Sequence, residues 1–99
     1  MLHIVNKSPA QGSGLASCLR LVRPGQTVLL IEDAVLAATR GNAAASGVAA
    51  VQGAVKIVAL APDLAARGAG SQLAEGIATV DYAGFVALVA EHPTNQSWL

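Results

Sequence analysis

The sequence lacks most of the features that reveal a function directly. Its 99 residues include a single cysteine, and aromatic side chains make up only 3%. One cysteine excludes a framework of intramolecular disulfides, and so few aromatic rings give little stacking surface for single-stranded nucleic acid. No stretch of about 20 residues stays apolar, which argues against a membrane-spanning helix. Because no charged leader with an apolar segment and cleavage site is found, we expect a cytoplasmic protein.

Charge and metal ligands are also sparse. Six basic and six acidic side chains cancel, and they are scattered along the chain. Neutralising nucleic-acid phosphates requires clustered Lys and Arg, so we expect no direct nucleic-acid binding. His3 and His92 are far apart in sequence and lack the spacing of metal ligands. We therefore predict neither a metal site nor a cofactor.

What the sequence does contain is an alternation of short apolar runs and helix-like segments. Apolar runs that predict strands occupy residues 2–5, 27–31, 55–60 and 77–80. Alternation of this kind predicts a parallel sheet between layers of helices. We expect one small three-layer α/β domain over residues 1–99. Its sheet should be mostly parallel and four- or five-stranded, with helices on both faces and a flavodoxin-like winding.

Helices are expected between and after these strands. Ser13 is placed to cap a helix in which every third or fourth residue is apolar, namely Leu15, Cys18, Leu19 and Val22. Further helices are predicted over 34–40, 48–52 and 62–67. Asp81 is expected to cap a last helix that runs to Glu91, with a buried stripe formed by Phe85, Val86, Leu88 and Val89.

Cys18 is the one residue whose chemistry can define a function. A thiolate accepts a sulfane sulfur, holds it as a persulfide and passes it on, which requires exposure and a lowered pKa. A position near a helix start favours the thiolate, and Arg20 is close in sequence. However, Cys18 also falls on the apolar stripe of its helix, which is typical of a core residue.

Two polar motifs suggest weaker alternatives. The segment from Gly12 to Ser17 resembles part of a dinucleotide-binding loop, but its third glycine is replaced and the preceding loop is too long. A loop with a helix cap is the simpler interpretation. Glu32 and Asp33 follow the second strand and suit acid–base or metal chemistry. In the simpler interpretation Asp33 caps the next helix and Glu32 forms a salt bridge or partner contact.

The sequence also predicts roles for three residues outside these motifs. His3 lies among apolar neighbours in the first strand, which favours a hydrogen-bonded structural role. Trp98 and Leu99 are expected to form an exposed apolar end that contacts another subunit.

Three separated segments resemble one small protein family in order and spacing. They are residues 1–9 (MLHIVNKSP), 28–33 (VLLIED) and 80–86 (VDYAGFV), and residues 62–68 (PDLAARG) and 98–99 fit as well. On these segments the chain is similar, nearly end to end, to the TusB/DsrH family of sulfur-relay subunits.

The resemblance implies a function that the residues alone do not specify. Members of this family are the smallest of three homologous subunits in a cytoplasmic heterohexamer that passes persulfide sulfur between protein thiols. Implied partners are TusC/DsrF-like and TusD/DsrE-like subunits and, through the complex, a TusE/DsrC-like sulfur acceptor. The sulfur ends either in the 2-thio group of the tRNA wobble uridine or in dissimilatory sulfur oxidation.

In this family the principal sulfur-accepting cysteine belongs to the TusD/DsrE-like subunit. The resemblance therefore implies an auxiliary or structural subunit. DsrH-type members carry a cysteine in a context equivalent to Ser17-Cys18-Leu19, which makes Cys18 a candidate secondary persulfide site and favours the oxidation branch. Two alternatives remain open: an assembly module of the same fold without sulfur chemistry, and an independent enzyme that uses Glu32 and Asp33.

Overall fold

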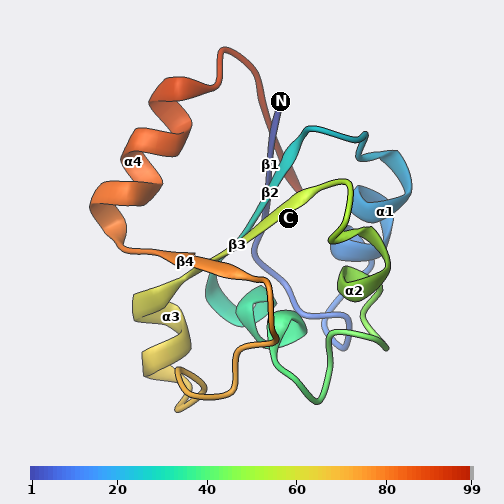
Figure 1. The fold of residues 1–99 in the computed structure, drawn as a ribbon, viewed down its shortest axis with the longest axis vertical. Coiled ribbons are helices and arrows are strands. Elements are labelled where there is room, and N and C mark those ends of the chain that lie inside the picture. Colours follow the sequence, from blue (N-terminus) through green and yellow to red (C-terminus); the bar gives the residue numbers. More distant parts are fainter. Residues whose placement is uncertain (99) are drawn as a thin grey trace.

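Five parallel strands form the framework of the protein (Figure 1). The computed structural model describes residues 1–98, and its sheet has the strand order β4-β3-β2-β1-β5. The four predicted strands are present, and a fifth, which the expected four- or five-stranded sheet allows, lies at residues where no strand was predicted. The strands are β1 (Leu2–Val5), β2 (Thr27–Leu30), β3 (Lys56–Leu60), β4 (Ala78–Val80) and β5 (Asn95–Trp98).

Helical segments cover both faces of this sheet, as the sequence predicts. Figure 1 shows α1 and α2 on one side of the sheet and α4 on the other. Within residues 1–98, none of the helices combines the length and apolar character needed to cross a bilayer. The segments are α1 (Gly14–Leu21), the 3-10 helix η1 (Glu32–Ala38), α2 (Val48–Val51), α3 (Ala61–Ala66) and α4 (Tyr82–Glu91).

The chain winds in two directions from β1. It adds β2, β3 and β4 in order on one side, and α4 then carries it back across the sheet to β5 on the other side of β1. Parallel neighbours require crossover connections of this kind. As a result, the loops that follow β1, β2 and β3 all collect at one edge of the sheet, where α/β proteins place their sites.

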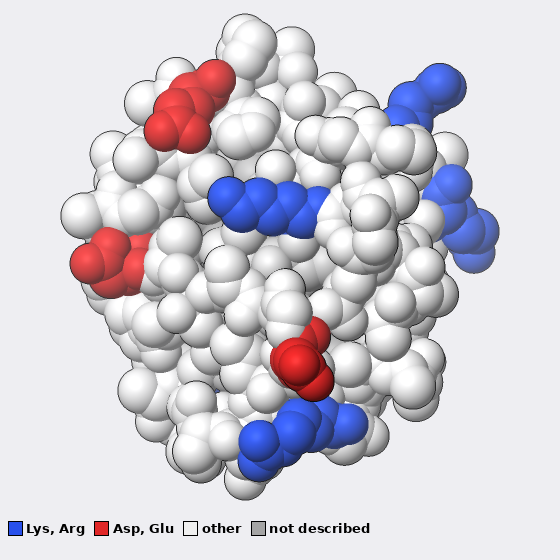
Figure 2. Space-filling model, in the orientation of Figure 1, with Lys and Arg blue, Asp and Glu red and all other residues white. Residues whose placement is uncertain are grey.

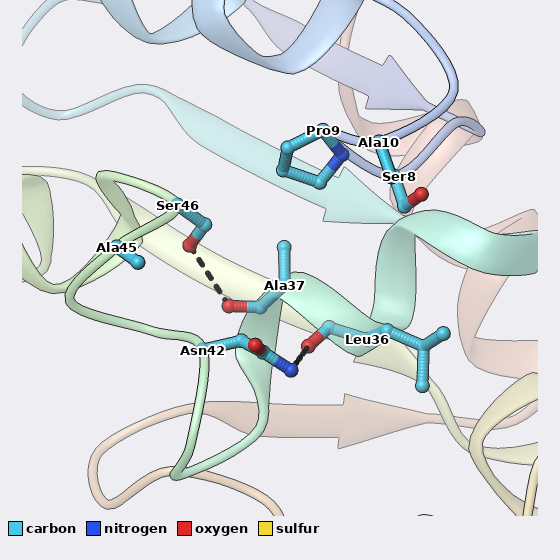
Figure 3. Close-up of a pocket in the computed structure, with 8 residues that line it drawn as sticks. All are labelled: Ser8, Pro9, Ala10, Leu36, Ala37, Asn42, Ala45 and Ser46. Carbon is cyan, nitrogen blue, oxygen red and sulfur yellow. Dashed lines mark hydrogen bonds between the residues drawn. The ribbon is translucent and has the colours of Figure 1, made fainter.

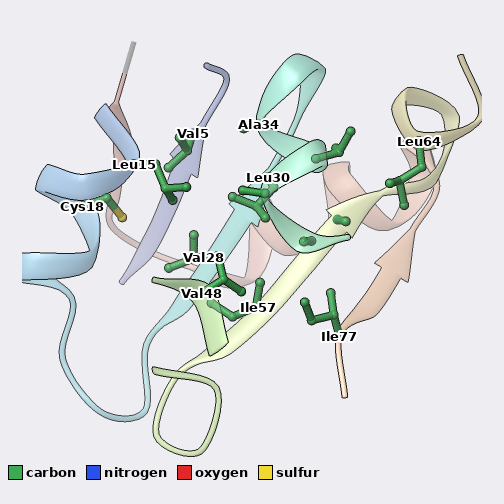
Figure 4. Close-up of a cluster of buried hydrophobic side chains, with 14 of the residues drawn as sticks. Val5, Leu15, Cys18, Val28, Leu30, Ala34, Val48, Ile57, Leu64 and Ile77 are labelled. Carbon is green, nitrogen blue, oxygen red and sulfur yellow. The ribbon is translucent and has the colours of Figure 1, made fainter. Parts of the chain in front are cut away.

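The core is divided by the sheet into two clusters. All four residues of β2 are buried, because this strand lies at the centre of the sheet with neighbours on both sides. The larger cluster lies under α1, α2 and η1 (Figure 4). The smaller cluster of Leu2, Leu29 and Val58 lies on the α4 side.

The structure corrects the expected orientation of α4. Phe85, Leu88 and Val89 pack against the smaller cluster, but Val86 points outward and is 67% exposed. The reason is that α4 is apolar around its whole circumference, so the pattern of its residues gives no direction for the buried face.

The position of strand β5, which the sequence pattern does not predict, changes the environment of Trp98. Residues 95–98 (NQSW) lack an apolar run, yet they pair in parallel with β1, with Val5 opposite Trp98. The Trp98 indole Nε1 donates to His3 Nδ1 over 3.1 Å, and the two rings stack with centroids 6.2 Å apart. The expected exposed end is therefore wrong for Trp98, and Leu99 lies outside the described residues.

His3 has the structural role that its position predicts. Its side chain is buried, and its second ring nitrogen, Nε2, lies 2.8 Å from Gln26 Oε1. Because Nδ1 accepts the Trp98 proton, Nε2 carries the ring hydrogen and donates to Gln26. The imidazole thus links β1, β5 and the turn before β2.

The predicted cap of α4 is confirmed and can be tested. Asp81 Oδ1 accepts the Gly84 backbone N–H at 2.8 Å. We predict that Asp81→Ala lowers the free energy of unfolding by about 1 kcal/mol, since a backbone donor loses its partner. Urea denaturation measures the change. Asp81→Asn keeps an acceptor and should lose less, and an alanine variant as stable as the wild type would contradict the assignment.

Candidate functional site

Polar side chains meet where β1, β2 and β3 end. They come from the loop after β1, from η1, from α3 and from the residue that follows α3, and are separated in sequence by as many as 61 residues. This group, the carboxyl-edge network, comprises Asn6, Gln11, Glu32, Asp33, Asp63 and Arg67.

Asp33 is the centre of the carboxyl-edge network. Arg67 Nε lies 2.7 Å from Asp33 Oδ1, and Gln11 Nε2 donates to Asp33 Oδ2 at 2.5 Å. Two hydrogen bonds hold the pKa of the Asp33 carboxyl below its usual value. The one from Arg67 contributes most, and the one from Gln11 contributes less. Asp33 makes no capping hydrogen bond to η1, so the expectation that it caps this helix is wrong.

Glu32 has an unusual backbone at the start of η1. Its φ is 50°, in the left-handed region that side chains other than glycine rarely adopt. The Glu32 backbone N–H donates to Asp63 Oδ2 at 2.6 Å, which holds the residue in this conformation. The exposed carboxylate accepts only a long bond, 3.5 Å from Asn6 Nδ2. Among residues 1–98 the single ion pair is Asp33–Arg67, so the expected Glu32 salt bridge is not formed there.

The carboxyl-edge network holds the strand ends in place. A carboxylate that is kept ionised by a cation is poorly matched to general acid–base work near neutral pH. Residues 1–98 also contain no group of three or more His, Cys, Asp or Glu side chains arranged to hold a metal ion. The simpler interpretation of this segment as structural is therefore favoured, although Asp33 rather than Glu32 forms the ion pair.

A pocket of about 300 Å³ lies beside the loop after β1 (Figure 3). Its walls are the loop at 8–10, η1 and the turn at 42–46. Ser46 Oγ donates to the Ala37 carbonyl at 3.0 Å, and Asn42 Nδ2 donates to the Leu36 carbonyl at 3.2 Å. The lining residues carry neither charge nor thiol, so the pocket itself supplies no reactive group. They are Ser8, Pro9, Ala10, Leu36, Ala37, Asn42, Ala45 and Ser46.

Cys18 lies on the buried side of α1, which faces the sheet. Its exposed fraction is 0%, and Figure 4 shows its sulfur directed from α1 toward the sheet, beside Leu15 and Val5. Burial raises the pKa of the thiol to about 12. Roughly one thiol in a hundred thousand is then ionised at neutral pH. Desolvation thus outweighs the helix dipole, and Arg20 instead donates to Ser17 Oγ at 3.2 Å.

The glycine-containing segment does not form a ligand-binding helix start. Gly14 begins α1, and a Cβ on it would lie 3.2 Å from the Trp98 carbonyl oxygen. A side chain at this position would be tightly packed, because β5 lies directly against the helix start. Ser13 makes no side-chain capping bond to α1, so that expectation is also wrong.

Comparison with known proteins identifies the family. The family described as "DsrH like protein" matches residues 7–95. TusB of Escherichia coli K12 is 37% identical over 98 residues, covering 99% of this chain and 100% of that protein. The chain belongs to the TusB/DsrH family. A TusB of Shigella boydii is 36% identical over 98 residues with the same coverage.

Two solved structures share the fold of this chain. The ychN protein of E. coli is similar with a TM-score of 0.78 and 18% identity, and the match covers 97% of each chain. MTH1491 of Methanobacterium thermoautotrophicum gives a TM-score of 0.72 and 22% identity, covering 97% of this chain and 95% of that one. These likenesses confirm the α/β fold.

The burial of Cys18 predicts slow reaction with thiol reagents. At about pH 8 we expect native Cys18 to react with iodoacetamide at least a hundredfold more slowly than in guanidinium chloride, because burial raises the pKa of its thiol to about 12 and shields the sulfur. Mass spectrometry over time measures the rate.

A matched control is available on the same helix. Leu21 is 64% exposed, so a cysteine introduced by Leu21→Cys in a Cys18→Ser background should react at the rate of a free thiol. Native Cys18 that reacts within tenfold of this control would show that α1 does not protect it.

Proposed function

We propose that this chain is a subunit of a cytoplasmic sulfur-relay complex that passes persulfide sulfur between protein thiols. The observation that carries the proposal is the similarity to TusB over 99% of the chain at 37% identity. Because the curated relatives named above are TusB proteins, this similarity favours delivery toward tRNA wobble-uridine 2-thiolation. The DsrH-like context of Cys18, taken by itself, favours the sulfur-oxidation branch instead.

Within this complex the chain acts as an auxiliary subunit. In sulfur relay a thiolate attacks the outer sulfur of a donor persulfide, and the donor's inner sulfur leaves as a thiolate. The attacking thiolate must be ionised and accessible. Cys18 is the one cysteine in this sequence, and it is buried with a pKa of about 12. The principal acceptor thiol therefore belongs to a partner, which the family resemblance indicates is the TusD/DsrE-like subunit.

Cys18 itself is proposed as a secondary persulfide site. Leu15 and Cys18 are the buried residues of α1, so a donor reaches the sulfur only after α1 moves away from the sheet. Such movement exposes apolar surface and is unfavourable. Loading of Cys18 should consequently be slower than loading of a partner's loop cysteine.

A second candidate function is an assembly module of the same fold without sulfur chemistry. The observation that favours it is again the complete burial of Cys18. The two candidates differ in one respect that can be measured, which is whether this subunit ever carries a sulfur adduct within the complex.

The experiment uses the complex co-expressed with its TusC/DsrF-like and TusD/DsrE-like subunits. After incubation with a persulfide donor protein, mass spectrometry of each subunit records the added sulfur. We expect rapid loading of the TusD/DsrE-like subunit and slow, partial loading of this chain at Cys18. Cys18→Ser should weaken the relay to a TusE/DsrC-like acceptor without abolishing it.

Each other outcome has a defined meaning. No adduct on this chain under any loading condition would leave it an architectural subunit. Loading of this chain alone, with the relay abolished by Cys18→Ser, would make Cys18 the primary site and overturn the auxiliary role. Failure to form any complex with the two homologous subunits would contradict the proposed function itself.

A further inference from the structure

Helix α4 is apolar on all sides but is not buried on any. Among its ten residues only Glu91 is charged, and none is buried. The face directed at the sheet is half-buried. The opposite face, here called the outer α4 face, is exposed throughout and consists of Tyr82, Ala83, Val86, Ala87 and Ala90. Helices that are apolar all round are normally covered on both sides, so this face requires a partner surface.

The exposure of the outer α4 face is concentrated in two large side chains. Tyr82 is 62% exposed and Val86 is 67% exposed, and they lie one turn apart on the same face. A tyrosine beside an aliphatic residue is typical of the centre of a protein interface, where rigid aromatic side chains anchor the contact.

Charge restricts what can cover this face. Asp81 precedes the helix and Glu91 ends it, and no basic residue lies in the last turn. Figure 2 shows an uncharged surface over α4, with acidic atoms near its ends. Glu91 is also unfavourable at a helix C-terminus, where the dipole is negative. A partner that places Lys or Arg beside the carboxyl end of α4 relieves this unfavourable charge on Glu91, whereas Asp81 is already stabilised as the cap of the helix.

Pairing with a second copy of this chain is disfavoured by the same charges. An antiparallel pair of α4 helices places Asp81 of one copy beside Glu91 of the other at both ends of the contact. A parallel pair places identical acidic residues together. Like charges brought together across an interface oppose association and favour a different partner.

Area gives a further constraint on the partner. A helix of ten residues is about 15 Å long, which is shorter than an interface of about 800 Å² per partner requires. The contact must therefore continue beyond α4 onto neighbouring surface. A folded domain can provide such a continuous surface, whereas a single short peptide cannot.

We propose that the outer α4 face is the docking surface for a different, homologous subunit, whose apolar contact face is bordered by Lys or Arg. This inference rests on the proposed function, because that function supplies the partner. It adds the surface that this chain uses and the charge that the partner must carry.

The test compares two lysine substitutions at equally exposed apolar positions. Val86→Lys places a charge in the proposed contact, and Leu21→Lys, on α1, is the matched control at 64% exposure. Binding of each purified variant to the co-expressed TusC/DsrF-like and TusD/DsrE-like subunits is measured by calorimetry. Thermal denaturation checks that each variant folds.

We expect Val86→Lys to weaken binding at least tenfold, because a lysine charge loses its hydration in the interface. Leu21→Lys should bind as the wild type does. Glu91→Lys should weaken binding about threefold, which is typical of a rim charge, and should increase self-association of the isolated chain as measured by sedimentation velocity.

The outcomes separate this inference from the proposed function. If the wild type binds the homologous subunits and Val86→Lys binds equally well, the outer α4 face is not the docking surface and the proposed function stands. If the wild type binds neither subunit, the proposed function fails. If the isolated wild type forms a dimer that Val86→Lys disrupts, the face serves a second copy of this chain and the inference is overturned.

Discussion

All five strands run parallel, and this arrangement fixes the positions of the connecting loops and of helix α4. Each connection must return from the carboxyl end of one strand to the amino end of the next. The segments that follow β1, β2 and β3 therefore meet at one edge, where the Asp33–Arg67 ion pair joins η1 to α3. The same constraint sends α4 alone across the second face on its way to β5. A single helix covers that face, and its own outer side is left without a partner among residues 1–98.

The competition between two electrostatic effects decides the role of Cys18. A helix start stabilises a thiolate modestly, by a few tenths of a kcal/mol to about 1 kcal/mol. Cys18, however, is the fifth residue of α1 and is fully buried, and removing its thiolate from water raises the pKa to about 12. Under the proposed function, a subunit with its one thiol in this state depends on a partner for rapid chemistry. Burial of the cysteine and exposure of α4 thus point to the same conclusion, that this chain works within an assembly.

The strands were predictable because their apolar runs are local signals. The four runs from Leu2 to Val80 match β1 to β4 closely, and the parallel α/β class follows from their alternation with helices. By contrast, β5 is polar and is held by its pairing with β1 and by the contact of Trp98 with His3, which no local pattern contains. The outward direction of Val86 was unpredictable for a related reason, since α4 has no polar face.

The candidate site was predictable only in part. Glu32 and Asp33 were recognised because they follow a buried strand, and the stripe that contains Cys18 was recognised from its spacing. Gln11 and Arg67, which bind Asp33, were missed because they lie 22 and 34 residues away from it in sequence. The pocket formed by Ser8 to Ala10 and the turn at 42–46 carries no motif, and only the folded chain brings its walls together.

Native mass spectrometry of the tagged chain, isolated from the cells that produce it, tests the central claim most directly. The account predicts a discrete hetero-oligomer that contains this chain and its two homologous subunits in equal numbers, with the sulfur adduct mainly on the TusD/DsrE-like subunit. A chain that is recovered only as a monomer or as a complex with itself, from cells that also produce both homologues, would contradict it.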